Sequence, residues 1–196
     1  WLSLPYIEMT ATMLKEFGIE SNIDHQKGSI TISAPQTYRG PKVYDIEPDA
    51  TAATYPMGLG VLHGVPMTLE GLDRSALQGD VAFVDALVQM GCEVKEENNH
   101  FLISRSTPLK AIQMDLNNIP DAAMTVAVLC SVAEGKSQLT GLKNLAFKEC
   151  DRLQALATEL NKMGAKVEAH ADGFNIQGIP LSSLKGADIE TYHDHR

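Results

Sequence analysis

A repeat of 73 residues constrains the fold of this 196-residue chain more than any other feature of its sequence. Two kinds of residue recur at this spacing: glycines that follow Phe or Met at expected helix ends, and isoleucines in expected strands. The recurring residues are Gly18, Gly91 and Gly164, and Ile30, Ile103 and Ile176. A fixed period indicates one supersecondary unit used several times. Because solenoid repeats rarely exceed about 50 residues, the longer period predicts a small α/β layer instead.

The hydrophobic pattern predicts the same element order, β-α-β-α-β-β, in each unit. In the middle unit the expected elements are strands at residues 43–46, 67–70, 93–95 and 100–104, a helix from Asp49 and a helix near residues 80–90. The helix from Asp49 contains Pro56, Gly58 and Gly60. Because these residues weaken helices, we expect it to be kinked or short.

The last unit follows the same order. Its expected elements are strands at residues 112–116, at residues 138–142 and near Val167 and Phe174, a helix from Asp121 and a helix that runs to Met163. Asp121 has the chemistry of an N-cap, and Gly135 that of the residue after a helix end. The helix between them is apolar on most sides, which predicts that it is buried.

The repeat is incomplete at both ends of the chain. The first residues match the second helix of a unit, ending at Gly18, and are followed by a hairpin whose second strand is residues 29–32. Prolines and a glycine between residues 35 and 41 predict a linker before the middle unit. At the other end, Asp194 lies 73 residues after Asp121 and should also start a helix that follows a strand. We therefore expect a segment of a longer α/β protein.

Composition limits the class of protein. The chain is 44% hydrophobic and 21% charged, as ordinary globular proteins are, and it has no apolar run near the roughly 20 residues that cross a bilayer. Three cysteines without metal-binding spacing fit a reducing compartment, so we expect a soluble, cytoplasmic protein. The net charge of -9 argues against general nucleic-acid binding. An anionic ligand would therefore have to be met by a local cluster of cations.

Residues 144–152 contain such a cluster. If they open a helix, Lys148 and Arg152 stand four apart on one face, with Glu149 beside them. Two cations at a helix N-terminus make an anion site, and a carboxylate among them could move a proton. The alternative is a solvated helix face with weak surface ion pairs, and spacing alone does not decide between them. Asp121 has the same ambiguity, since an N-cap oxygen could also face a cleft.

Three motifs resemble signatures of one enzyme family. They are Pro120-Asp121-Ala122-Ala123-Met124-Thr125, Asn144 through Lys148-Glu149-Cys150-Asp151-Arg152, and Tyr192-His193-Asp194-His195-Arg196. Shorter matches are Pro5-Tyr6-Ile7, Glu47 with Asp49-Ala50, and Leu77-Gln78-Gly79-Asp80. In this order they resemble the middle to late part of the 5-enolpyruvylshikimate-3-phosphate (EPSP) synthases. That family implies two domains of three units each about a pseudo-threefold axis, with the active site between them. Residues 1–41 would finish the first domain, and residues 42–196 would form two full units and the start of a third.

The resemblance also implies an activity. It is the transfer of the enolpyruvyl group of phosphoenolpyruvate to the 5-hydroxyl of shikimate 3-phosphate, with release of phosphate, in aromatic amino acid biosynthesis. No metal and no organic cofactor are implied, and the partners would be the two substrates and the missing remainder of the chain. By motif, the reacting centre would contain Asp121 as the base, Lys148, and Glu149 as the group that transfers a proton at the methylene carbon. Phosphoenolpyruvate would be held by Arg152 and Arg196, and shikimate 3-phosphate by Ser3, Tyr6 and Asn144.

Departures from the family leave other functions open. The family commonly has Arg and Thr where this chain has Ala146 and Cys150, and several of its phosphate-binding residues have no counterpart in this sequence. The segment alone should therefore be inactive. One alternative is a non-catalytic module that binds an anion or docks onto a partner chain. Another is UDP-N-acetylglucosamine enolpyruvyl transferase, which usually carries a reactive cysteine in a Gly-rich loop; no cysteine here has such neighbours.

Overall fold

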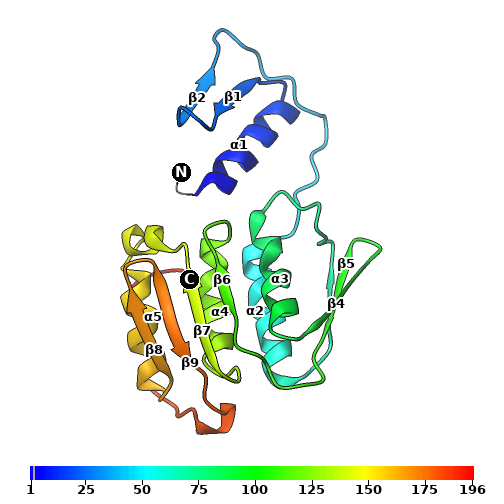
Figure 1. Ribbon diagram of the computed structural model, residues 1–196. Coiled ribbons are helices and arrows are strands. Elements are labelled where there is room, and N and C mark those ends of the chain that lie inside the picture. The colour runs from blue at the N-terminus through cyan, green and yellow to red at the C-terminus, as the bar shows by residue number, and fades with distance from the viewer. Residues whose placement is uncertain (2) are drawn as a thin grey trace.

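The computed structural model describes residue 1 and residues 3–196, and it contains two lobes joined by an irregular connector (Figure 1). The small lobe has one helix and a two-stranded antiparallel hairpin. Its elements are α1 (Leu4–Glu16), β1 (Ser21–Asp24) and β2 (Ser29–Ile32). Gly18, with φ +78°, follows the helix end as predicted. The connector between β2 and the second lobe, which includes the linker predicted at residues 35–41, contains no helix or strand.

The large lobe contains two successive units. The first comprises α2 (Ala50–His63), β3 (Met67–Glu70), η1 (Gly79–Ala82), α3 (Phe83–Gln89), β4 (Glu93–Glu97) and β5 (His100–Ser104). The second comprises β6 (Gln113–Asp115), η2 (Pro120–Ala122), α4 (Ala123–Cys130), β7 (Lys136–Thr140), η3 (Lys143–Phe147), α5 (Arg152–Lys162), β8 (Lys166–His170), β9 (Gly173–Gln177) and η4 (Leu181–Ser183).

The two units share a strand order. The first sheet runs β3-β5-β4 and the second β6-β7-β9-β8, so the order β3-β5-β4 corresponds to β7-β9-β8. The bounds of β8 and β9 are those of β4 and β5 displaced by 73 residues. β6 adds to the second sheet as a parallel neighbour of β7. The repeat seen in the sequence is therefore a repeat of α/β layers.

Helices α2 and α4 lie side by side between the two sheets (Figure 1). Thr54 Oγ1 is 3.0 Å from Thr125 Oγ1, and a Cβ added at Gly58 would lie 2.8 Å from the Thr125 side chain. Gly58 therefore permits the close approach of the two helices. Burial of α4 is confirmed. Helix α2 was expected to be kinked or short; it is not short, since it has 14 residues despite Pro56, and a kink at Pro56 stays a prediction. Packing against α4 and the core stabilises helix α2, although the helix propensities of its proline and glycines are low.

Two local predictions for these units were also wrong. Residues 43–46 form no strand, and the side chains of Val43 and Ile46 are 76% and 87% exposed. Pro41 and Pro48 bracket this stretch, and proline cannot donate to a ladder. Glu47 instead accepts hydrogen bonds from the backbone N–H groups of residues 77 and 78, at 2.8 and 2.9 Å, which holds the chain at η1.

Gly135 does not follow the end of α4, which ends at Cys130. The backbone of Glu134, four residues past the end of α4, forms an isolated parallel bridge with Lys110, on the segment that enters from the first unit. Its N–H donates to the carbonyl of Leu109 at 2.7 Å, and its carbonyl accepts from Ala111 at 3.1 Å. Gly135, with φ +115°, lies in the turn before β7. None of the described helices is long and apolar enough to span a membrane.

Candidate functional site

The first turn of α1 faces the large lobe (Figure 1). It brings Ser3 and Tyr6, two of the expected substrate-binding residues, into contact with that lobe. The Asn144 amide, on η3, donates to Ser3 Oγ at 3.3 Å, and the Tyr6 hydroxyl donates to Asp80 Oδ2 at 3.2 Å. A Cβ added at Gly79 would lie 3.3 Å from Pro5, so the backbone of η1 approaches α1 closely. Ser3, Tyr6 and Asn144 are therefore grouped where the two lobes meet.

Asp121 is the centre of the predicted reacting residues. It lies in η2 rather than at an N-cap, because a 3-10 turn starting at Pro120 precedes α4. Its side chain is 13% exposed, and it faces three cations. Lys148 Nζ and Arg152 Nη1 lie 3.4 and 3.2 Å from Oδ1, and Arg196 Nη2 lies 3.5 Å from Oδ2. The N-cap expectation was wrong because these ion pairs take the carboxylate.

The helix expected to open within residues 144–152 begins only at Arg152. Residues 143–147 form η3, and Lys148 is extended, with φ −87° and ψ −157°. Asp151 is the N-cap of α5 and accepts hydrogen bonds from the N–H groups of residues 153 and 154, both at 3.1 Å. Lys148 and Arg152 are therefore not helical neighbours. They meet because both contact Asp121.

Arg152 is a buried cation, with its side chain 4% exposed. It donates through Nε and Nη2 to the two oxygens of Asp194, at 2.8 and 2.9 Å, and through Nη2 to Glu149 at 2.8 Å. Burial alone would lower the pKa of Arg152, but the bonds to Asp194 and the nearby charges of Asp121 and Glu149 raise it. The same bonds lower the pKa of Asp194 to about 2. This fork-to-fork pair is the geometry in which arginine binds carboxylates most strongly.

No strand lies in residues 184–193, so the expected strand before Asp194 was wrong. Only two residues follow Asp194 in this sequence, so the helix expected to start there stays a prediction. The Asp194 carboxylate is bound by Arg152. Two features of the sequence singled out Asp194: its 73-residue separation from Asp121 and the motif of residues 192–196. The sequence did not indicate the bond to Arg152, because the two lie 42 residues apart.

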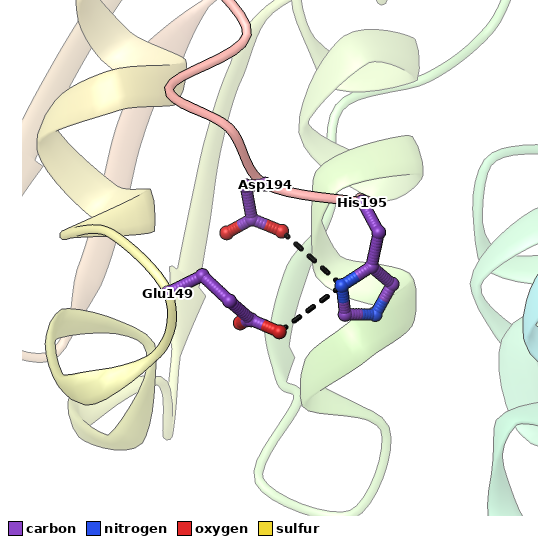
Figure 2. Close-up of side chains that lie close together, drawn as sticks. All are labelled: Glu149, Asp194 and His195. Atoms are coloured by element: carbon purple, nitrogen blue, oxygen red, sulfur yellow. Dashed lines mark ion pairs between the residues drawn. The ribbon is translucent and has the colours of Figure 1, made fainter.

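His195 and Glu149 form a further pair beside these residues. Figure 2 shows the imidazole of His195 beside the carboxylates of Glu149 and Asp194, with Nδ1 facing both. Nδ1 lies 3.0 Å from Glu149 Oε1 and 3.8 Å from Asp194 Oδ1. These three groups are close enough to hold a metal ion. However, Arg152 donates to both carboxylates, so a metal would lie against a guanidinium group. The three groups are therefore a poor site for a metal ion.

Asp80 is a residue to which the sequence assigned no role. It is 2% exposed, accepts from Thr51 Oγ1 at 2.7 Å and from Tyr6, and its Oδ1 has no hydrogen-bond partner among the described residues. Burial raises the pKa of Asp80, and Asp121 adds to the shift. The pKa of Tyr6 is also raised, first by burial and then by Asp80 and Asp121. The motif at residues 77–80 was the only signal of this carboxyl group.

Comparison with known proteins matches the whole chain to one family. A family model described as EPSP synthase (3-phosphoshikimate 1-carboxyvinyltransferase) covers residues 1–196. The 3-phosphoshikimate 1-carboxyvinyltransferases of Histophilus somni and Photobacterium profundum share 41% and 42% sequence identity with this chain, in alignments that cover all 196 residues of it. The chain spans 44% and 45% of their lengths, less than half.

The fold also has a match among solved structures. An EPSP synthase from Acinetobacter baumannii superposes with a TM-score of 0.71 at 24% identity, covering 93% of this chain and 44% of that one. The similarity in structure supports the α/β repeat fold, and the match in sequence carries the assignment. The chain belongs to the EPSP synthase family.

Proposed function

We propose that the whole protein carrying this chain transfers the enolpyruvyl group of phosphoenolpyruvate to the 5-hydroxyl of shikimate 3-phosphate. The observation that carries this proposal is the convergence of Lys148, Arg152 and Arg196 on Asp121. Both substrates are polyanions, and arginine forks suit phosphate and carboxylate groups. A carboxylate at the centre of three cations could also accept a hydroxyl proton.

Unpartnered polar atoms support a ligand at the same place. Four buried side-chain atoms of the described residues have no hydrogen-bond partner, and three of them belong to residues of this site: Asp80 Oδ1, Asn144 Oδ1 and Arg196 Nε. Buried polar groups are nearly always paired, because leaving one unpaired costs about 1–3 kcal/mol. All three belong to residues that contact Asp121, Ser3 or Tyr6. A substrate bound here would supply hydrogen bonds that the chain itself does not.

Each residue then has a role in two balanced steps. In the addition step, the 5-hydroxyl oxygen bonds to C2 of phosphoenolpyruvate, its proton passes to Asp121, and C3 takes a proton from Glu149. In the elimination step, C3 returns its proton to Glu149 and the bond from C2 to the phosphate oxygen breaks. The leaving phosphate takes the proton that Asp121 received, so both carboxyl groups regain their starting protonation. Lys148, Arg152 and Arg196 would neutralise the phosphate and carboxylate groups throughout.

Shikimate 3-phosphate would be oriented by the residues at the meeting of the lobes, Ser3, Tyr6 and Asn144. Residues 1–41 would belong to the first domain and residues 42–196 to the second, so these contacts would join the domains. The cations near Asp121 are already balanced by the carboxylates of Asp121, Asp194 and Glu149. Further cations from the rest of the protein would therefore be needed to bind two polyanions.

The test is phosphate release by the whole protein. We expect release only when both substrates are present, and loss of release in Asp121→Asn, whose amide cannot take the hydroxyl proton. No release with both substrates, or release with UDP-N-acetylglucosamine in place of shikimate 3-phosphate, would refute the proposal. A verified 196-residue chain should bind weakly and show no turnover, because much of the catalysis depends on the complete bound geometry.

A further inference from the structure

Glu159 is a buried acid on α5, outside the cluster around Asp121. It is 7% exposed and accepts three hydrogen bonds. Lys162 Nζ donates to Oε2 at 2.7 Å, the Glu190 backbone N–H donates to Oε2 at 3.1 Å, and the Tyr192 hydroxyl donates to Oε1 at 2.8 Å. The bond from Lys162 is the main cause that lowers the pKa of Glu159. Two of these hydrogen bonds join the buried Glu159 carboxylate to residues 190 and 192, near the end of this sequence.

These residues, 186–196, are called the C-terminal strap here. They contain no helix or strand, and they run from η4 back toward the start of α5 (Figure 1). The strap is attached to α5 at two places. Glu159 and Lys162 hold it near the end of the helix, where Lys162 Nζ also donates to the Asp188 carbonyl at 3.3 Å. Arg152 holds Asp194 at the helix start.

The strap turns sharply between these two attachments. Tyr192 and His193 have φ +54° and +53°, a left-handed conformation that non-glycine residues adopt rarely and at a cost. Two consecutive residues in this region need surrounding contacts to hold them. The Tyr192 N–H donates to Glu190 Oε1 at 3.0 Å, and the Tyr192 hydroxyl donates to Glu159 Oε1. The Asp194 N–H donates to the Thr191 carbonyl at 2.9 Å, a hydrogen bond that spans the turn.

The turn at residues 192 and 193 sets the direction of the side chains of residues 194–196. Directly after it, Asp194 reaches Arg152, His195 reaches Glu149, and Arg196 reaches Asp121. The Arg196 N–H also donates to Asp194 Oδ1 at 3.0 Å, which couples the two ends of this stretch. A rotation at residue 192 or 193 would move all three side chains together. The contacts of Glu159 therefore bear on the anion site without touching it.

We propose that Glu159 is a positioning residue, which holds the strained turn of the C-terminal strap so that Arg196 and the Asp194–Arg152 pair are presented to phosphoenolpyruvate. The inference rests on the proposed function of the site. A carboxylate suits this site because all three partners donate to it and one of them is a cation. Glutamine would turn its NH2 group either toward the Tyr192 hydroxyl, which reverses that bond, or toward the two donors at Oε2, and in both cases it would lose the charge that Lys162 faces.

The test uses the whole protein with two variants and two matched controls. Glu159→Gln removes the charge, and Tyr192→Phe removes only the hydroxyl, so at least one folded variant is expected. The controls make the same chemical changes at exposed positions, Glu168→Gln on β8 and Tyr38→Phe in the connector. Amide hydrogen exchange of residues 188–196 is measured together with the KM for each substrate.

We expect faster exchange in the strap and a KM for phosphoenolpyruvate raised roughly 2- to 10-fold, the range for one lost hydrogen bond. The KM for shikimate 3-phosphate and kcat should stay near wild type, because Ser3, Tyr6 and Asn144 lie on other elements. Unchanged exchange in both variants would overturn the inference. An equal rise in both KM values, or a fall in kcat alone, would also overturn it, since a purely structural role has no preference for one substrate.

Failure of the proposed function is distinguishable from failure of this inference. If the wild-type protein releases no phosphate from the two substrates, the function is refuted. The exchange measurement does not depend on turnover, and it still shows whether Glu159 holds the strap.

Discussion

Replacing the buried Arg152 by methionine should destabilise the protein far more than the same change at an exposed arginine. Methionine preserves most of the side-chain volume, so the change removes the charge and its hydrogen bonds with little loss of packing. The side chains of Arg152 and Asp194 are each 4% exposed. Removing one partner of such a pair leaves an uncompensated buried charge, for which we expect a cost of about 3–5 kcal/mol.

Arg74 provides the matched control. Its Nη2 lies 2.7 Å from Asp85, as close as in the buried pair, but the two side chains are 50% and 44% exposed. Because solvent screens the pair, Arg74→Met should cost at most about 1 kcal/mol. The shortest distances are similar at both sites, so the difference between the two variants reports burial together with the additional partners of Arg152, which are Asp121 and Glu149.

The assay is urea unfolding of the whole protein at neutral pH, followed by far-UV circular dichroism. A double variant of Arg152→Met with Asp194→Asn should cost less than the sum of the single variants, with a coupling of up to about 3 kcal/mol. It does so because Asp194→Asn removes the charge that Arg152→Met leaves buried. Equal costs for Arg152→Met and Arg74→Met, or additive behaviour of the double variant, would refute the reasoning.

Other changes test the roles assigned to single residues in the whole protein. Lys148→Met should raise the KM for phosphoenolpyruvate, since a missing cation weakens ground state and transition state alike; an unchanged KM in steady-state assays would argue against contact with this substrate. Glu149→Gln should lower kcat and spare binding measured by calorimetry, and a near-parental kcat would remove it from proton transfer. Tyr6→Phe should raise the KM for shikimate 3-phosphate roughly 2- to 10-fold, because one hydrogen bond near Asp80 is lost, and an unchanged KM would contradict this role. Asp194 has a folded pKa of about 2, below its unfolded value of about 4, so its contribution is present above pH of about 4 and is lost as pH falls toward 2. The difference in urea midpoint between wild type and Asp194→Asn should shrink in that window, and a constant difference would rule out this linkage.

Much of the fold could be read from residue patterns that depend on local chemistry. The helix end at Gly18, the strands at residues 67–70 and 100–104, and the buried helix α4 were all predicted from such patterns. Predictions failed where a distant contact outweighed the local pattern. Residues 43–46 look like a strand but run as a connector held by Glu47, and Gly135 looks like a helix end but lies in the turn before β7.

The candidate site shows the same division. Motifs in the sequence identified Asp121, Lys148, Glu149, Arg152 and Arg196, and the structure brings them into one cluster. The reason given for their proximity was wrong, since they do not share a helix face. Sequence motifs could identify these residues because binding an anion and moving a proton require particular side chains, namely cations and carboxylates. They could not give the other pairings, because every contact of the cluster except Arg152–Glu149 joins segments far apart in the chain.

By itself, the sequence determined the 73-residue repeat, the α/β class of its units and the residue types that can bind an anion. These follow from local propensity, hydrophobic period and side-chain chemistry, which need no knowledge of the rest of the chain. Only the tertiary structure decided that Arg152 is buried against Asp194, that Asp80 receives Tyr6 from the other lobe, and that Glu159 holds the C-terminal strap. Burial and long-range hydrogen bonds depend on how the layers pack, and packing brings together residues that no local pattern connects.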